Sequence, residues 1–270
     1  MGLILSLDNS IHSFNKGGFV GLLDQYTGAA AGYSLRRLSV NSTNVVRVRR
    51  SSDNAESDFT ADEITDGTLL AWVGNTASDN GFVTTWYDQA GSNDATQATA
   101  ASQPKIVDAG VLVEENGKPA MQFDSFKHLV TSSFSALSTY TFFDVLFANN
   151  SNQFMRDGIS NTNRSALYIV STTRYNRGTG NASAYTNNIQ SLYTTIASGS
   201  DTNLAQNGSS FQLLSVGSDT LTGINIGGVY DNSTLPFLGK YQELILYPSD
   251  QSSNRTGIET LLNNYYNIYP

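Results

Sequence analysis

The sequence predicts an all-β fold, an antiparallel β-sandwich (jelly roll) that ends in a short C-terminal helix. Two observations predict it. Short apolar or alternating runs recur along the 270 residues, in places about ten residues apart, and turn-forming pairs of residues separate them. This density of short strands is typical of antiparallel sandwiches. The chain has no internal repeat and no Pro-rich or charged linker, so we expect one sandwich domain over residues 17–270.

Residues 1–16 differ from the rest of the chain. An apolar stretch, Leu3-Ile4-Leu5, is followed by the polar run Asn9-Ser10-Ile11-His12. We expect this segment to be an N-terminal arm outside the core that contacts other proteins.

The segment 45–49 has the clearest strand pattern. Val46 and Val48 share one face, whereas Arg47 and Arg49 share the other. Further strands are expected at 82–87, 111–113, 120–123, 140–147, 166–170, 211–216, 224–229 and 241–247. Tight turns are expected at Asn116-Gly117, Asp157-Gly158 and Asn207-Gly208.

Two segments have helical spacing instead. Residues 62–72 carry apolar side chains compatible with a helix, although Gly67 weakens it. Residues 252–266 place Ile258, Leu261, Leu262 and Tyr265 on one helical face. We expect the strand at 241–247, a turn at Pro248 and this helix to form the closing unit of the domain.

Composition excludes several classes of function. There is no cysteine, which excludes disulfides and thiolate sites, and only two histidines, His12 and His128. A net charge of −8 disfavours nucleic-acid binding. No apolar run is long enough to span a membrane, and no secretory leader is expected. No loop has the regular spacing of oxygen ligands that a calcium site needs, so we expect neither metal nor cofactor.

The most informative motif is the run from Trp86 to Gln97, in which two aromatic residues lead into a polar turn. Trp86 and Tyr87 could stack on a sugar ring while Asp88 and nearby amides bind its hydroxyls. The structural alternative is that Trp86 packs in the core and that Asp88 and Asn93 hold the turn through backbone amides. The structural alternative is favoured by the residue types alone.

A second polar group holds half of the arginines: Arg36, Arg37, Arg47, Arg49 and Arg50. They could receive an anionic sugar or the carboxylates of a partner. The favoured alternative is a solvated strand face neutralised by Asp53, Glu56 and Asp58. His12 and His128 have no carboxylate neighbours in sequence and are expected to be surface or arm residues rather than bases.

A third group follows Gly227-Gly228, where Tyr230 and Asp231 are expected on a loop. Paired glycines let backbone approach a ligand closely, and Asp231 could accept hydrogen bonds from hydroxyls or act as an acid. The alternative is an ordinary hairpin turn.

These stretches resemble the catalytic-domain family of α-L-arabinofuranosidase B. The resemblance is carried by Ala31–Arg37, Val46–Asp53, Thr85–Gly91 and the ending from Gly227 to Asp250. It covers roughly residues 20–268 and implies a concanavalin A-like β-sandwich. Similar modules without assigned activity occur in bacteriophage structural proteins and bacterial surface proteins.

The catalytic residues of that family are only partly present. The resemblance implies that Asp231 corresponds to the acid/base, displaced by two inserted residues, while the nucleophile should be a mid-chain Glu. No Glu occurs between Glu115 and Glu243, and the cysteine pair of the family's sugar pocket is absent. Asp201 or Asp219 could substitute, but both lie in turn-like stretches. Retaining hydrolysis needs two carboxylates.

The sequence therefore predicts a non-catalytic structural or carbohydrate-binding module, with Trp86, Tyr87, Asp88, Tyr230 and Asp231 near the sugar-facing surface. We expect a bacteriophage virion component, or an extracellular or cell-surface protein, that forms homo-oligomers, contacts neighbouring virion or surface proteins through its arm and binds host glycans. The alternatives are an arabinofuranosidase-like hydrolase using Asp231 and a purely architectural virion protein.

Overall fold

The computed structural model describes residues 18–270 apart from 150–151, 171–172, 177–182, 185, 187, 216 and 218. The expected arm at 1–16, with His12, lies outside the described residues. The strands are β1 (Ala31–Ser34), β2 (Asn44–Arg50), β3 (Glu56–Thr60), β4 (Gly81–Trp86), β5 (Ala95–Thr96), β6 (Lys105–Asp108), β7 (Val111–Leu112), β8 (Glu114–Glu115), β9 (Lys118–Pro119), β10 (Met121–Phe123), β11 (Leu129–Thr131), β12 (Thr139–Ala148), β13 (Asn152–Asp157), β14 (Leu167–Val170), β15 (Thr173–Asn176), β16 (Ser183–Ala184), β17 (Gln190–Ser198), β18 (Asp201–Gln206), β19 (Gln212–Ser215), β20 (Asn225–Ile226) and β21 (Gly239–Tyr247). The helices are α1 (Leu22–Gln25), α2 (Ala61–Thr65), α3 (Thr68–Val73), a short 3-10 turn (Ala100–Ser102) and α4 (Arg255–Tyr266).

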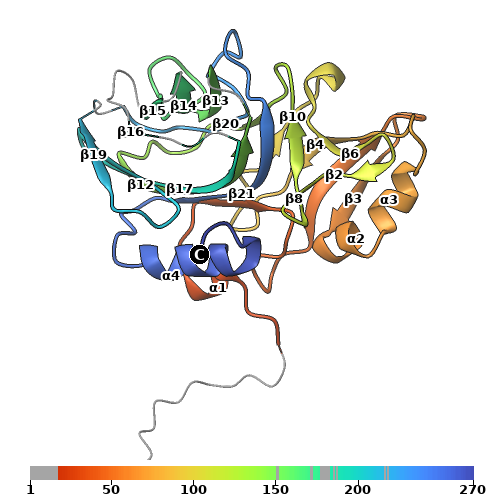
Figure 1. Cartoon of the computed structure of the whole chain (residues 1–270), viewed down its shortest axis with the longest axis horizontal. Helices are drawn as coiled ribbons and strands as arrows, with labels where there is room; N and C mark the ends of the chain where they lie inside the picture. Colours follow the sequence, from red (N-terminus) through yellow and green to blue (C-terminus); the bar gives the residue numbers. More distant parts are fainter. Residues whose placement is uncertain are drawn as a thin grey trace, which may run out of the picture.

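The strands form a sheet that curls over on itself. Within the described residues, 19 strands are connected by antiparallel pairing. One layer contains β19, β18, β17, β12 and β21, and the facing layer contains β16, β15, β14, β13 and β20 (Figure 1). Strands β10, β6, β4, β5 and β11 connect the two layers. The antiparallel sandwich predicted from the sequence is confirmed.

The core between the layers is apolar and aromatic, with one buried ion pair. Arg156 on β13 reaches Asp144 on β12 at 3.0 Å, and both side chains are fully buried. The guanidinium lies 3.6 Å from the ring centre of Phe142, and Tyr241 donates a hydrogen bond to the same carboxylate. This network joins the two layers at one fixed position.

The outer face of the first layer is covered by helices. Strand β12 buries Phe142 toward the sandwich core and Phe143 toward the helices, so both faces of the strand are apolar. Helix α4 packs Ile258 and Leu262 against this second face, as the predicted helical spacing requires, and α1 lies beside it (Figure 1). The expected helix at 62–72 is split into α2 and α3 at Gly67, whose φ is +92°.

The predicted turns are partly correct. Asn116-Gly117 and Asn207-Gly208 have the positive φ values of two-residue hairpin turns. Asp157-Gly158 does not form such a turn, because Asp157 is the last residue of β13. Among the helices of the described residues, none is long and apolar enough to cross a membrane.

Candidate functional site

Trp86 lies in the core and not at the surface. Its exposed fraction is 0%, and its ring contacts those of Tyr33 and Tyr241 at centroid distances of 5.6 and 6.3 Å. The prediction that Trp86 contributes to a sugar-facing surface is therefore wrong, since a ligand in solvent cannot reach the indole. The structural alternative for Trp86 is the correct one.

Asp88 holds the turn that follows β4. Its Oδ1 accepts hydrogen bonds from the amides of Gly32 (2.8 Å) and Ala90 (2.9 Å), and its Oδ2 accepts one from Asn93 (3.0 Å). Burial raises the pKa of the carboxyl group, while these amide bonds oppose that shift. Both oxygens accept from backbone amides, so Asp88 holds the turn as the structural alternative predicted, and the residue also lines the pocket described below.

Gln89 fixes the same turn to the loop that follows β1. Its side-chain oxygen accepts from the amide of Leu38 (2.7 Å), and its side-chain nitrogen donates to the carbonyls of Ser34 (3.0 Å) and Arg36 (2.9 Å). The Asp and Gln of the Tyr-Asp-Gln motif therefore stabilise the fold, because their hydrogen bonds join the turn after β4 to β1 and to the loop that follows β1.

Tyr87 is the member of the motif that faces outward. Its ring is half-buried, and its hydroxyl donates to Asp58 at 2.7 Å. The Arg47 guanidinium binds the same carboxylate at 2.7 and 3.0 Å. Burial and the neighbouring carboxylate raise the pKa of Tyr87 to about 12, and the hydrogen bonds from Arg47 lower the pKa of Asp58. The three side chains form a rigid polar cluster.

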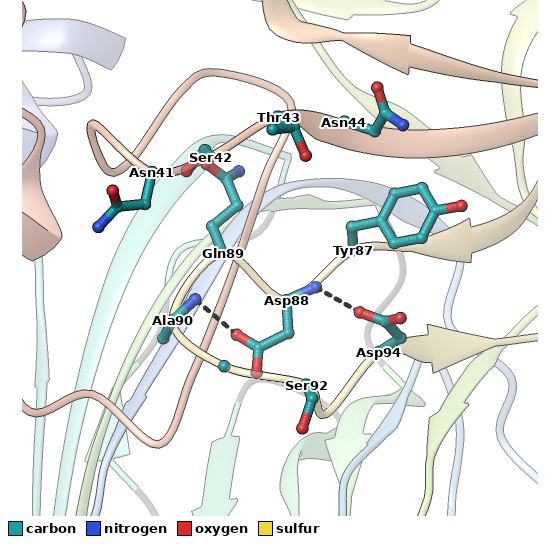
Figure 2. A pocket seen from close by; sticks show the side chains of 11 residues that line it. Asn41, Ser42, Thr43, Asn44, Tyr87, Asp88, Gln89, Ala90, Ser92 and Asp94 are labelled. Carbon is teal, nitrogen blue, oxygen red and sulfur yellow. Dashed lines mark hydrogen bonds between the residues drawn. The ribbon is translucent and has the colours of Figure 1, made fainter.

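A hollow of about 480 Å³ lies beside Tyr87, between the 41–44 loop and the 87–94 turn (Figure 2). We call it the Tyr87 pocket. Its lining consists of Asn41, Ser42, Thr43, Asn44, Tyr87, Asp88, Gln89, Ala90, Gly91, Ser92 and Asp94. The volume is within the range of roughly 300–1,000 Å³ that small-molecule sites occupy.

The pocket offers hydrogen-bonding groups that the fold does not use. Among the described residues, the side chains of Asn41, Thr43, Asn44 and Ser92 make no hydrogen bond to protein. Asp94 uses only Oδ1, which accepts from the Asp88 amide at 2.9 Å, as Figure 2 shows. Its other oxygen is left to accept from a ligand. Sequence reasoning missed Asn41 and Asn44, because only the fold brings the two loops together. Asp94 lies within the 86–97 run but was not chosen from it as a site residue.

The loop with Tyr230 and Asp231 is built on other strands. Tyr230 is half-buried under the guanidinium of Arg164, which lies 4.8 Å from its ring centre. Asp231 is exposed, and its Oδ1 accepts from the Ser233 amide (3.1 Å) and hydroxyl (2.7 Å). The hydroxyl bond is the main cause of the lowered pKa of Asp231.

A carboxylate that the sequence reasoning missed lies beneath this loop. Asp157 binds Arg164 at 2.7 Å and accepts from the amide of Tyr230 at 3.1 Å. Its other oxygen accepts from the amides of Gly158 (2.8 Å) and Ser165 (3.3 Å). Burial raises the pKa of Asp157, whereas Arg164 and the amides stabilise the ionised form. Asp157 was missed because the pair Asp157-Gly158 was interpreted as a tight turn.

These two carboxylates are poorly suited to glycoside hydrolysis. A retaining glycosidase needs one carboxyl group with a raised pKa as acid and a second, free carboxylate as nucleophile. Asp231 is exposed and its lowered pKa keeps it ionised, but Asp157 is only 1% exposed and donors take all four of its acceptor positions, so Asp157 is not accessible to a substrate.

The arginine cluster is largely neutralised, as the favoured alternative predicted. Arg47 pairs with Asp58, and Arg50 pairs with Asp53 at 2.7 Å. Arg36 instead makes a bidentate pair with Glu243, which the sequence reasoning missed.

His128 shares a hydrogen bond with Gln97, and burial lowers its pKa. In the described part of the chain, no group of three His, Cys, Asp or Glu residues could hold a metal ion.

The fold is similar to that of known enzymes. A mutant GH54 α-L-arabinofuranosidase soaked with 4-nitrophenyl α-L-arabinofuranoside has a TM-score of 0.61 at 15% identity, covering 86% of this chain and 62% of that one. The GH54 enzyme soaked with a cyclic sulfate inhibitor gives 0.62 at 14% identity and the same coverages. An arabinofuranosidase complexed with arabinofuranosyl-α-1,2-xylobiose gives 0.62 at 15%, covering 86% and 61%. No family model and no curated protein sequence matches the chain.

This similarity concerns the fold. The chain spans about three-fifths of the length of these arabinofuranosidase structures, at low identity. The protein is a concanavalin A-like antiparallel β-sandwich with one longer C-terminal helix, a fold that also carries carbohydrate-active enzymes.

Proposed function

We propose that the protein is a non-catalytic carbohydrate-binding module whose ligand site is the Tyr87 pocket. The observation that carries the proposal is the set of unused donors and acceptors on two adjoining loops beside the half-buried Tyr87 ring. Saccharides are bound by such a combination, in which amides and carboxylates bind hydroxyls and an aromatic ring covers the apolar face of the sugar.

The proposed ligand is an uncharged glycan. The lining carries the carboxylates of Asp88 and Asp94 and no Lys or Arg. Uronic or sialic acids would bring a negative charge toward these carboxylates, which is unfavourable in a partly enclosed site. A neutral sugar has hydroxyl donors for the free oxygen of Asp94.

A glycan array carrying neutral and acidic saccharides tests this proposal. We expect binding to neutral glycans only, and loss of that binding in Asn44→Ala, which removes one unused amide of the pocket. The double variant Tyr230→Ala, Asp231→Ala is the matched control for the other predicted loop. Binding that survives Asn44→Ala and is lost in the double variant would move the site to the 227–233 loop.

The second candidate is an arabinofuranosidase-like hydrolase, favoured by the similarity in fold and by an Asp after the paired glycines. The burial and full occupancy of Asp157 argue against it, because they leave the exposed Asp231 without an accessible second carboxylate on this loop. Incubation with 4-nitrophenyl α-L-arabinofuranoside decides between the two. Turnover that Asp231→Asn abolishes would reverse the assignment.

We also propose that the module is displayed in many copies on a virion or cell surface, as its resemblance to phage and surface modules suggests. Repeated display would compensate for weak binding at each single site. Antibodies against the chain should label intact particles or cells in electron micrographs. Labelling confined to the cell interior would contradict this location. It would not affect the glycan-binding proposal, which the glycan array tests separately.

A further inference from the structure

A second hollow lies near the Tyr87 pocket, because Tyr87 of the pocket and Arg47 of the second hollow bind the same carboxylate, Asp58. Strand β4 ends at the buried Trp86, and Thr85 before it and Tyr87 directly after it are both half-buried, on the side opposite to Trp86. Because alternate residues of a strand are about 7 Å apart, the two outward side chains are neighbours. Tyr87 lines the pocket described above, and Thr85 lines the second hollow of about 340 Å³.

The floor of this second hollow is a row of polar residues across three strands. Arg47 of β2 pairs in register with Thr85 of β4, and Thr85 pairs with Thr96 of β5. Paired residues on antiparallel strands have Cβ atoms about 5 Å apart, so their side chains form a continuous strip. Glu56 and Gln97 also line the hollow.

The strip has unused hydrogen-bonding groups, as the pocket has. In the described part of the chain, the hydroxyls of Thr85 and Thr96 make no hydrogen bond to protein. Thr96 is exposed and Thr85 is half-buried, so both are accessible to a ligand.

A hydrogen-bonded cluster lies between the two hollows. In this cluster the Arg47 guanidinium binds the Asp58 carboxylate at 2.7 Å, and the Tyr87 hydroxyl donates to the same carboxylate at 2.7 Å. Side chains already held by hydrogen bonds have less conformational freedom to lose when a ligand binds. The cluster presents guanidinium donors toward the Thr85 side and an aromatic ring toward the pocket.

We infer that the ligand is an oligosaccharide chain, with one unit in the Tyr87 pocket and the next unit on the Arg47–Thr85–Thr96 strip. This inference rests on the proposed function, because it extends the same binding site. Two neighbouring hollows along one strand favour a linked chain over a single sugar, since the second unit adds contacts without a second loss of translational freedom.

Calorimetric titration with ladders of one to four units of glucose, xylose, galactose and mannose tests the inference. In the series that binds, we expect affinity to rise at least fivefold from one unit to two. The double variant Thr85→Val, Thr96→Val keeps the β-branched shape and removes both hydroxyls. It should lose about three- to tenfold in affinity for the longer chains and leave the affinity for the single sugar unchanged.

The two ways of failing are distinguishable. An affinity that does not depend on chain length, or an equal loss for the single sugar and the chain in the Thr variant, overturns the second subsite and leaves the pocket intact. Failure of every ladder and of the glycan array overturns the pocket and the subsite together.

Discussion

Asp88 and Tyr87 are adjacent in sequence and have different roles. The Asp88 carboxylate is buried and accepts from three backbone amides, whereas the Tyr87 ring faces a pocket. Strand alternation predicts that Trp86 and Tyr87 point to opposite sides, and the structure has Trp86 inside. Asp88 is held in place because its carboxylate accepts from the amides of Gly32 and Asn93. Gly32 is 56 residues away in sequence, so the sequence alone does not reveal this contact.

Removing the Asp88 carboxylate should destabilise the fold. In Asp88→Ala, three backbone N–H groups lose their acceptor, and we expect the free energy of unfolding to fall by about 3–5 kcal/mol. Urea denaturation measures this. Ser92→Ala, at an exposed residue of the same turn, is the control and should change stability by less than about 0.5 kcal/mol. An Asp88→Ala protein as stable as the wild type would refute the structural role.

Tyr87 should make stability depend on alkaline pH. Its pKa is about 12 in the folded protein, above the usual value of 10.0. The raised pKa contributes stability that is complete below pH 10 and is lost as pH rises from about 10 to about 12. In Tyr87→Phe this part of the alkaline loss should disappear. Thermal unfolding measured between pH 8 and pH 12 checks it, and parallel curves for both proteins would contradict it.

At the scale of elements, Asp157 fixes the 227–233 loop to β13. Asp157→Ala would leave Arg164 without its carboxylate and the Tyr230 amide without its acceptor. We expect faster hydrogen exchange at the Tyr230 amide and a loss of roughly 3–5 kcal/mol in stability. Asp231→Ala is the control, because Asp231 bonds only within its own turn, and exchange at Tyr230 should be unchanged. Equal effects of both variants would contradict this role of Asp157.

The same scale explains what the sequence could predict. Strands β2, β4, β12 and β21 were predicted because their apolar residues alternate or form unbroken runs. Strand β17 was missed: its buried residues include Ser191, Thr194 and Thr195, which carry no apolar pattern. Of the residues that line the Tyr87 pocket, only Tyr87 and Asp88 were predicted as site residues. The other wall is formed by residues 41–44, and no local sequence pattern reveals that this segment lies beside the 87–94 turn.

At the scale of the whole molecule, the curled sheet determines where ligands can bind. The two facing layers are joined by the fully buried Asp144–Arg156 pair, so the interior is closed by packing. Helix α4 covers the outer face of the first layer. The two hollows proposed as the ligand site therefore lie outside the core. The Tyr87 pocket lies between the 41–44 loop and the 87–94 turn, and the second hollow lies over β2, β4 and β5.

The central claim is that an uncharged glycan binds beside Asp94 without being hydrolysed. Calorimetric titration of the array's strongest neutral glycan into the wild type, Asp94→Asn and Asp231→Asn tests it most directly. Asparagine keeps the shape and the acceptor for the Asp88 amide but replaces the free carboxylate oxygen by a donor. We predict at least tenfold weaker binding for Asp94→Asn and an unchanged affinity for Asp231→Asn. Binding abolished by Asp231→Asn and retained by Asp94→Asn would contradict the account.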